Sequence, residues 1–526
     1  MNPEEIEKKQ KRVMIYVMIV SLICVVGVSY AFFTAGMSSE TSTTVRADAG
    51  TMKITYNGGA NINLAGIYPK DDVWATKTIT VTGNNTTDAE MYYKLTLVVD
   101  SNTFKTDDPL QYELVSTNTS TNGEIIPNIS KTDITGTSIE LGSGHFVKAN
   151  NAKHTYLLKI YYPKKTTSQN ANQGAAFSAH VEITSAKAPK TNGKLSELVL
   201  YNNEVKTPIT APGKEVSTAS EALLASTPDD YGTSYYFRGA VKNNYVEFAN
   251  KCWRIVRVGG DGSVKLILHN DNTAKAANPC NSANNSTTAA FARYSGTTYK
   301  SAFNTNADDN AYVGFMYGTP GSSTYADTHA NTNKSTILTN LETWYNNNLK
   351  TYESVIDDNV WCNDKTNVTD TTYNPWNMSN VNGLGYGTNK TYYGATQRLV
   401  SKSNSAGGTG PSLKCNGELS KINSKVGLIT ADELAFAGYA YNIRNTVTYL
   451  KENTSGEWWS LSPSDYISIY ANVWTVESYG TYFTTGLGGR GGRGVHDSCG
   501  VRPLISLKST TNVTGNGSSD KPYKVV

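Results

Sequence analysis

Residues 76–99 read TKTITVTGNNTTDAEMYYKLTLVV, two runs of alternating apolar and polar side chains on either side of a polar turn. Successive side chains of a β-strand point to opposite faces, so this alternation predicts strands with one buried side. Further short runs occur at MKITY (52–56), LQYELV (110–115), YLLKIYYP (156–163) and FSAHVEIT (177–184). Antiparallel strands without an intervening helix predict an all-β sandwich, jelly-roll-like, over residues 45–186.

Length and composition limit the classes of protein. A chain of 526 residues predicts two or three domains. Only 17% of the residues are charged and the net charge is +3, which is too weak for a protein that binds nucleic acid electrostatically. The 34 Tyr, 12 Phe and 8 Trp supply material for cores and oppose intrinsic disorder. We therefore expect a folded multi-domain protein with no nucleic-acid partner.

The N-terminal region predicts export. An uncharged apolar run from Val13 to Phe33 is long enough to cross a bilayer core as a transmembrane helix. Lys and Arg in residues 1–12 predict that this end stays cytoplasmic and that the rest is outside. Small residues at Ser29 and Ala31 also permit cleavage after Ala31, so signal peptide and membrane anchor both remain open.

Cysteine usage agrees with export. Cys24 lies in the apolar run, and five cysteines follow it, at Cys252, Cys280, Cys362, Cys415 and Cys499. An odd number allows at most two disulfides and one free thiol within the chain. We predict the pair Cys362–Cys415, which would staple a loop-rich stretch, although spacing alone leaves the connectivity open.

The C-terminal half predicts an α+β domain. Residues 187–215 contain Pro189, Pro208 and Pro212 among polar residues and are predicted to form a linker before a domain at 216–526. Strand-like CWRIVRV (252–258) and VKLILH (264–269) flank Asp261-Gly262, a hairpin signal. A helix is predicted near 335–352, capped by Ser335, and another from Thr430, with Glu433 completing a capping box.

Two resemblances add expectations. SYAFFTAG, GTMKITY, KTITVTGN and YLLKIYYP make roughly residues 10–186 resemble the camelysin and biofilm-fibre family of exported bacterial proteins. That resemblance implies a structural module able to assemble by strand addition. Some members are labelled metallopeptidases, but the chain has no HExxH, and His145, His154 and His180 are scattered, so this activity is not carried over.

GEWWSLSPS (456–464), SIYANVWTVES (468–478) and GVRPLISL (500–507) resemble an exported bacterial domain related to the C-type-lectin-like and formylglycine-generating-enzyme folds. WRIVRVGGDGSVKLI and GLITADELAFAG extend the resemblance over roughly 195–526. It implies framework roles: Trp458, Trp459 and Trp474 as core aromatics that each need a partner for the indole N–H, and Arg502 as a donor to backbone carbonyls near the end of the chain.

The run 478–499 lies between these framework segments and predicts a ligand-binding face. Aromatic, Arg and small polar residues mix there as they do in paratopes. The run also lacks Lys, Glu, Gln, Met and Trp, as in the variable patch of retroelement-diversified receptors of this fold. An ordinary Gly-rich loop is the alternative. The predicted binding residues are Tyr470, Thr475, Tyr479, Tyr482, Phe483, Arg490, Arg493, His496 and Asp497.

These observations predict a protein on the outer side of a bacterial membrane, anchored or secreted. It would bind a surface ligand, protein or glycan, without catalysis. A biofilm-fibre subunit that self-assembles through the β-sandwich is the alternative. A formylglycine-generating-type enzyme comes third, because the active site of such an enzyme needs paired cysteines and only Cys499 lies near the closing motif.

No cofactor is predicted. A structural calcium is left open for the acidic pairs Asp229/Asp230, Asp308/Asp309 and Asp357/Asp358, which we interpret as solvated loop carboxylates.

Overall fold

The computed structural model describes residues 43–48, 51–85, 90–118, 122–185, 189–377, 391–467, 470–477, 482–484 and 493–526. The chain divides into two compact units, Met1–Ala188 and Pro189–Val526. The predicted membrane or signal segment at 13–33 lies outside the described residues. Within the described ranges, no helix is both long and apolar enough to span a bilayer.

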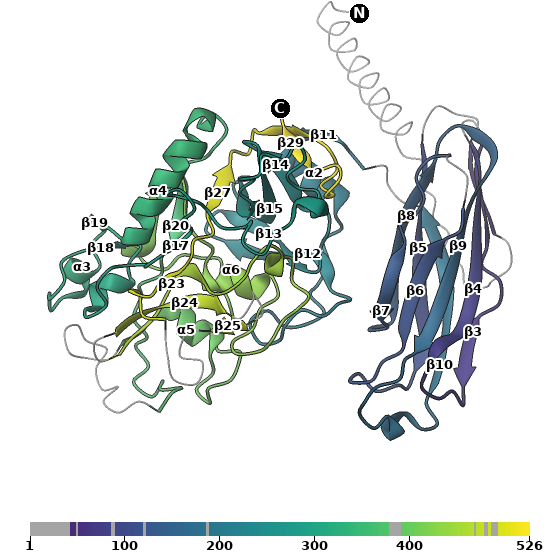
Figure 1. Ribbon diagram of the computed structural model, residues 1–526, viewed down its shortest axis with the longest axis horizontal. Helices are drawn as coiled ribbons and strands as arrows, with labels where there is room; N and C mark the ends of the chain where they lie inside the picture. Colours follow the sequence, from purple (N-terminus) through teal and green to yellow (C-terminus); the bar gives the residue numbers. More distant parts are fainter. Residues whose placement is uncertain are drawn as a thin grey trace, which may run out of the picture. The chain divides into compact units, whose positions relative to one another are not determined.

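The first unit is a β-sandwich (Figure 1). One sheet has six strands in the order β1 (Thr43–Asp48), β2 (Thr51–Asn57), β4 (Lys70–Asn85), β9 (Ala149–Tyr162), β6 (Gln111–Ser116) and β7 (Ile129–Asp133). The other has four, in the order β3 (Ile62–Ala65), β10 (Ala176–Ser185), β5 (Met91–Asn102) and β8 (Ser138–Phe146). A single 3₁₀ turn, Asn170–Asn172, is the only helical element among the described residues of this unit.

Alternation in the sequence produces this packing. In β5 every second side chain from Met91 to Val99 is buried, and the matching strand of the other sheet, β9, buries Tyr156, Leu158 and Ile160. The buried faces of both sheets form one apolar core. The expected β-rich fold is thus present.

His154 lies inside that core. The Tyr93 hydroxyl is 2.6 Å from its Nδ1, and its Nε2 is 2.7 Å from the carbonyl oxygen of Asn122. Burial lowers the pKa of His154, so it is neutral at pH 7 and acts as a core residue. His145 and His180 instead lie beside carboxylates of Glu90 and Asp100.

The second unit contains two larger sheets with short helices (Figure 1). The nine-stranded sheet consists of β11 (Asn192–Lys194), β12 (Ala222–Asp229), β13 (Gly232–Gly239), β14 (Tyr245–Phe248), β15 (Lys251–Val258), β16 (Val264–Asn270), β27 (Leu504–Leu507), β28 (Asn512–Thr514) and β29 (Tyr523–Val525). The six-stranded sheet consists of β17 (Lys300–Ser301), β21 (Thr391–Tyr392), β23 (Trp458–Ile467), β24 (Tyr470–Glu477), β25 (Tyr482–Thr484) and β26 (Cys499–Gly500).

Two further ribbons pair β18 (Met316–Tyr317) with β19 (Asn333–Lys334) and β20 (Asn359–Cys362) with β22 (Lys421–Ser424). The helices are α2 (Leu195–Asn202), α3 (Tyr325–Thr328), α4 (Thr336–Asn348), α5 (Gly394–Leu399) and α6 (Ala431–Phe436).

Local signals in the sequence account for several of these elements. Ser335 caps α4, its hydroxyl accepting a hydrogen bond from Leu338 N at 3.2 Å. Thr430 and Glu433 form the predicted capping box at the start of α6. Asp261-Gly262 turns the chain between β15 and β16, and Gly262 has the positive φ of 80° that such a turn requires.

The predicted linker at 187–215 is wrong for residues 192–202. Strand β11 pairs with β28, and α2 buries Leu195, Leu198 and Val199 in the core of the second unit. Prolines and polar residues on both sides of a single two-turn helix concealed its short apolar face.

Replacing Trp459 with Ala is expected to destabilise the second unit by about 3–5 kcal/mol, because the side chain is fully buried and its indole donates to Ser301 O at 2.8 Å. Differential scanning calorimetry of the full chain measures the Tm of the second unit as a transition of its own. Trp74→Ala, in the first unit and only half-buried, is the matched control. Equal melting of the second unit in both variants would contradict the core role of Trp459.

Candidate functional site

The predicted binding run is carried by antiparallel strands in the six-stranded sheet. Strand β24 pairs with β23 from Ile467↔Tyr470 to Trp458↔Val476, and with β25 from Thr475↔Thr484 to Glu477↔Tyr482. Among the described strands, β25 ends the sheet order β17-β26-β23-β24-β25. The run therefore starts from a rigid sheet, which is where a binding loop is best positioned.

Four of the nine predicted binding residues belong to β24 and to the segment 493–497 that runs beside it, and we name Tyr470, Arg493, His496 and Asp497 the 470–497 face. Tyr470 is 48% exposed and its ring stacks on that of His496, with centroids 5.7 Å apart and planes at 21°. Val495 N donates to Ala471 O at 2.9 Å, which fixes this segment beside β24. The result is an exposed aromatic stack on a fixed backbone.

Gly494 is required for that close approach. A Cβ at this position would lie 2.7 Å from Cε1 of His496 and 2.8 Å from its Nδ1, closer than side chains can approach. The absence of a side chain lets the imidazole fold back over the turn toward Tyr470.

Arg493 adds charge to the same face. Its side chain is 40% exposed and forms an ion pair with Glu457, while its Nη1 is 3.9 Å from Oδ2 of Asp497. The bond to Glu457 raises the pKa of Arg493 further, and burial followed by the charge of Glu457 raises the pKa of Glu477. The guanidinium of Arg493 therefore lies among the carboxylates of Glu457, Asp497 and Glu477, toward the end of β24 that pairs with β25, whereas Tyr470 lies at the start of the strand.

The other predicted binding residues have different outcomes. Thr475 is fully buried, opposite Trp459 on β23, and so does not present itself to a ligand in solvent. The prediction that Thr475 lies on the binding surface is therefore wrong, because other segments cover both faces of β24 at this residue. Tyr482 and Phe483 belong to β25, but their side chains lie outside the described part. Tyr479 and Arg490 also lie outside the described residues.

The framework residues are all buried. Trp459 Nε1 donates to Ser301 O, and Trp474 Nε1 donates to Thr396 Oγ1 at 3.2 Å. Trp458 Nε1 has no acceptor within the described protein, unlike the prediction that each indole finds one. Arg502 donates to backbone carbonyls as predicted, but these belong to Leu268 and Leu450, far from the end of the chain.

Asp465 lies behind the 470–497 face, fully buried on β23. Asn472 Nδ2 donates to its Oδ1 at 2.7 Å, and the Ser464 hydroxyl donates to its Oδ2. Burial raises its pKa to about 7, against the smaller opposing effect of these two hydrogen bonds. This carboxyl can therefore change charge near neutral pH, inside the hairpin that carries the candidate site.

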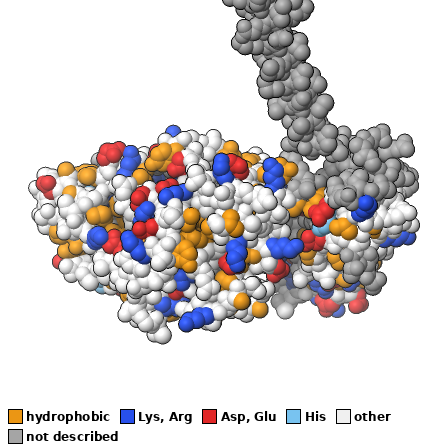
Figure 2. Space-filling model, turned by 90° about the horizontal axis from the view of Figure 1, so that it is seen from above, with side chains coloured by type: hydrophobic (Ala, Val, Ile, Leu, Met, Phe, Trp, Pro, Cys, Tyr) orange, Lys and Arg blue, Asp and Glu red, His pale blue; other side chains and the backbone are white. Residues whose placement is uncertain are grey.

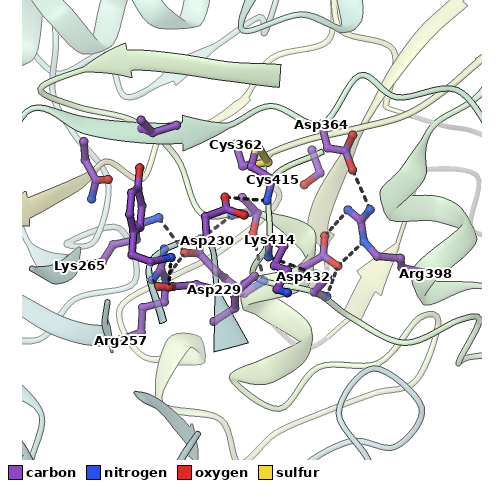
Figure 3. A pocket seen from close by; sticks show the side chains of 18 residues that line it. Asp229, Asp230, Arg257, Lys265, Cys362, Asp364, Arg398, Lys414, Cys415 and Asp432 are labelled. Atoms are coloured by element: carbon purple, nitrogen blue, oxygen red, sulfur yellow. Dashed lines mark hydrogen bonds and ion pairs between the residues drawn. A yellow bond between two sulfur atoms is a disulfide. The ribbon is translucent and has the colours of Figure 1, made fainter. Parts of the chain in front are cut away.

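A charged pocket is the second candidate site in the same unit (Figure 3). It encloses about 590 Å³, including the solvent at its open side, and the disulfide Cys362–Cys415 lies on its wall. The lining cations are Arg257, Lys265, Arg398 and Lys414, and the lining anions are Asp229, Asp230, Asp364, Asp432 and Glu433.

Ion pairs use most of these charges. Arg398 contacts both oxygens of Asp432, at 2.7 and 2.8 Å, and Asp364 at 2.7 Å. Glu433 accepts from Lys265 at 2.8 Å and from Arg257 at 3.0 Å. Burial raises the pKa of Glu433, but these two cations outweigh it and lower the pKa to about 2. Lys265, which is buried, and Arg257 and Arg398, which are mostly buried, are therefore neutralised by acidic residues of the protein itself. The network joins segments that are distant in the sequence.

Sequence reasoning missed this pocket. The interpretation of Asp229 as a solvated loop carboxylate is wrong: it is buried and accepts from Arg257 Nη1 and Gly260 N, each at 3.0 Å. These partners lie on β15 and in the turn that follows it, so no pattern of neighbouring residues predicts them. Asp230 accepts from Cys415 N at 3.0 Å.

The cysteines form two disulfides, Cys252–Cys280 and Cys362–Cys415, the second of which is the pair favoured from the sequence. Disulfides indicate an oxidising environment, extracellular or periplasmic.

Cys499 is free and buried, with its Sγ 3.7 Å from Glu457 Oε2. Burial raises the pKa of this thiol far above the ordinary range. The described residues contain no group of three or more His, Cys, Asp or Glu able to hold a metal ion.

On the face drawn in Figure 2, Lys and Arg side chains are interspersed with Asp and Glu, and apolar side chains are scattered.

Comparison with known proteins identifies no relative: no protein-family model matches the chain, and no curated protein is significantly similar to it.

Asp465→Asn should change how stability depends on pH. The pKa of about 7 in the folded protein lies above the value of about 3.9 expected for an unfolded aspartate, so the folded chain binds the extra proton between these values. The contribution of Asp465 to the free energy of unfolding is complete below about pH 4 and is lost as pH rises through 7. The amide oxygen still accepts from Asn472, and the amide NH2 can donate to the Ser464 hydroxyl instead of accepting from it, so the variant keeps two hydrogen bonds without a charge. It therefore gains stability relative to the wild type over this window, by at most about 4 kcal/mol.

Chemical denaturation of both proteins from pH 4 to pH 8 measures this difference. Asp497→Asn, a partly exposed carboxylate of the same hairpin region, is the matched control. Parallel stability curves for the wild type and Asp465→Asn would show that the carboxyl is charged throughout.

Proposed function

We propose that this is an exported bacterial surface protein whose second unit binds a ligand, protein or glycan, through the 470–497 face, without catalysis. The observation that carries the proposal is the exposed Tyr470–His496 stack, on a segment (493–497) that also carries the partly exposed Arg493. Rigid aromatics and Arg are the residues that supply most binding energy at recognition surfaces. The two disulfides support an extracellular site of action.

The sequence also suggests roles for the N-terminal segment, for the first unit and for the run 478–499. Residues 13–33 would anchor the chain in the membrane or direct its secretion, and the first unit, with a jelly-roll-like connection of strands, would act as a stalk. The second unit would be C-type-lectin-like, consistent with sheets and short helices around the GVRP segment. Residues 478–499 would be a diversified patch on its binding face.

A matched pair of exposed tyrosines tests the site. Tyr470 is 48% exposed on the 470–497 face, and Tyr231 is 58% exposed at the charged pocket of the same unit. The full chain, displayed on a non-adherent bacterial host, is applied to a glycan array and to immobilised extracellular-matrix proteins. Tyr470→Ala is expected to weaken the binding that the wild type shows by about tenfold or more, because it removes the stacking platform. Tyr231→Ala is expected to leave binding unchanged.

The opposite pattern would move the ligand to the charged pocket and overturn the assignment of the 470–497 face. Unchanged binding in both variants, with loss on deleting residues 34–186, would place recognition in the first unit.

A structural role is the second candidate, because among the described strands β1 ends its sheet and has β2 as its single neighbour. An edge strand presents unpaired backbone groups to which another copy can add a strand. Concentration-dependent fibres that disappear when residues 34–186 are deleted would favour this role over recognition.

Diversification makes a separate prediction. Sequencing codons 464–499 across a population of the source bacterium should show variation confined to the first two bases of codons in the run 478–499, with the codons of Trp474 and of residues 500–503 constant. A uniform sequence would mean that the run is a fixed loop, and would leave the ligand-binding proposal to the tyrosine variants.

A further inference from the structure

Arg502 is a fully buried cation without a carboxylate of its own. Its Nε donates to Leu268 O at 2.9 Å and its Nη1 donates to Leu450 O at 2.6 Å. No ion pair joins it to any acidic residue in the part of the chain that the structure describes. Burial lowers its pKa to about 10, so the guanidinium is still charged at neutral pH.

A second buried guanidinium uses the nearest acid. Arg254 is fully buried, and its Nη1 is 3.0 Å from Oε2 of Glu452. Its guanidinium carbon lies 3.8 Å from the centre of the Tyr245 ring and 5.2 Å from that of Tyr449. Two guanidinium groups therefore share one carboxylate, which leaves a positive charge uncompensated in the interior. An uncompensated buried charge is costly, so a partner of opposite sign is expected.

Four buried polar atoms around Arg502 have no hydrogen-bond partner within the protein: Arg502 Nη2, Trp458 Nε1, Tyr449 Oη and His269 Nδ1. The Trp458 ring centre lies 5.1 Å from the guanidinium carbon. Tyr449 adjoins Leu450, and His269 adjoins Leu268, the two residues whose carbonyls hold the guanidinium. β16, β23, the 3₁₀ turn at Tyr449–Lys451 and the GVRP segment thus meet at one cation.

All four atoms can donate. The indole and guanidinium nitrogens are donors only. The amide nitrogen of Asn453 lies 3.1 Å from His269 Nε2 and 3.0 Å from each of two oxygens, His269 O and Asn285 Oδ1, which is three acceptors for two hydrogens. His269 Nδ1 donates in the tautomer that carries the ring hydrogen on that atom. Burial, with the charges of Arg254 and Arg502, lowers the pKa of His269 far below its ordinary value, which keeps the ring neutral. Tyr449 alone could also accept a hydrogen bond.

Charge distinguishes an anion from water at this place. A buried water molecule could accept from these donors and donate to the Tyr449 hydroxyl or to the second lone pairs of the Leu268 and Leu450 carbonyls, but it would leave the guanidinium charge uncompensated. A halide accepts from every side and supplies the missing negative charge.

We propose that Arg502, Trp458, Tyr449 and His269 form a buried site for a monovalent inorganic anion of the size of chloride. Occupation would neutralise the excess positive charge and satisfy the unpaired donors, so the anion would stabilise the second unit without contacting the 470–497 face.

Thermal unfolding of the full chain in sodium chloride and in sodium gluconate of equal concentration tests this. Chloride is expected to raise the Tm of the second unit by about 2–4 °C, with a saturable concentration dependence, because a ligand that binds only the folded state stabilises it. Equal Tm values in the two salts would overturn the proposal.

Two conservative variants locate the effect. Tyr449→Phe removes one donor with little change of volume and is expected to reduce the chloride increment by at least half. Tyr373→Phe is the matched control, because Tyr373 is equally buried in the same unit but its hydroxyl is bonded to Thr396 O and Val400 O. It should lower the Tm equally in both salts and keep the increment. An undiminished chloride increment in Tyr449→Phe would show that the anion lies elsewhere and would overturn the site.

Crystals grown with bromide should show an anomalous peak beside Arg502. A peak only at other places would equally exclude an anion site at Arg502.

Discussion

Strand β23 is buried along almost its entire length, and the organisation of the second unit follows from that constraint. All residues from Trp458 to Tyr466 lie in the interior, so the side chains on both faces of the strand need partners from other segments. Ser301 receives the indole hydrogen of Trp459, and the Ser462 hydroxyl accepts from Ala431 N at the start of α6. Thr396 of α5 donates to the carbonyl of Ser464 at 2.9 Å. One strand thus fixes two helices and the β24 hairpin that carries the candidate site.

The interior of this unit is unusually polar for a protein in which only 17% of residues are charged. The pocket network neutralises Arg257, Lys265 and Arg398 with acids from other segments, so it ties the sheets to the loop that the Cys362–Cys415 disulfide closes. Such pairs add specificity to the fold more than stability, since desolvation offsets much of the attraction. Among the described residues, no acid forms an ion pair with Arg502 and no cation forms one with Asp465. The first observation underlies the proposed anion site, and the second underlies the expected dependence of stability on pH.

The division between rigid core and exposed face matches the proposed role. The tryptophans that flank the binding run are inaccessible, whereas Tyr470 and His496 form a platform that depends on the missing side chain of Gly494. A recognition surface built in this way can change at its exposed positions without disturbing the packing behind it.

The sequence by itself determined the features that depend on neighbouring residues. Alternation along β5 indicated a half-buried strand, Thr430 and Glu433 indicated a helix start, and Asp261-Gly262 indicated a hairpin, because each signal acts over a few residues. Only the tertiary structure decided what depends on distant segments. It buried Thr475 and Asp229 under other strands, included α2 in a core where a linker was expected, and gathered Arg502, Trp458, Tyr449 and His269 around one charge. Burial and charge compensation are set by residues far apart in the chain, and no local pattern encodes them.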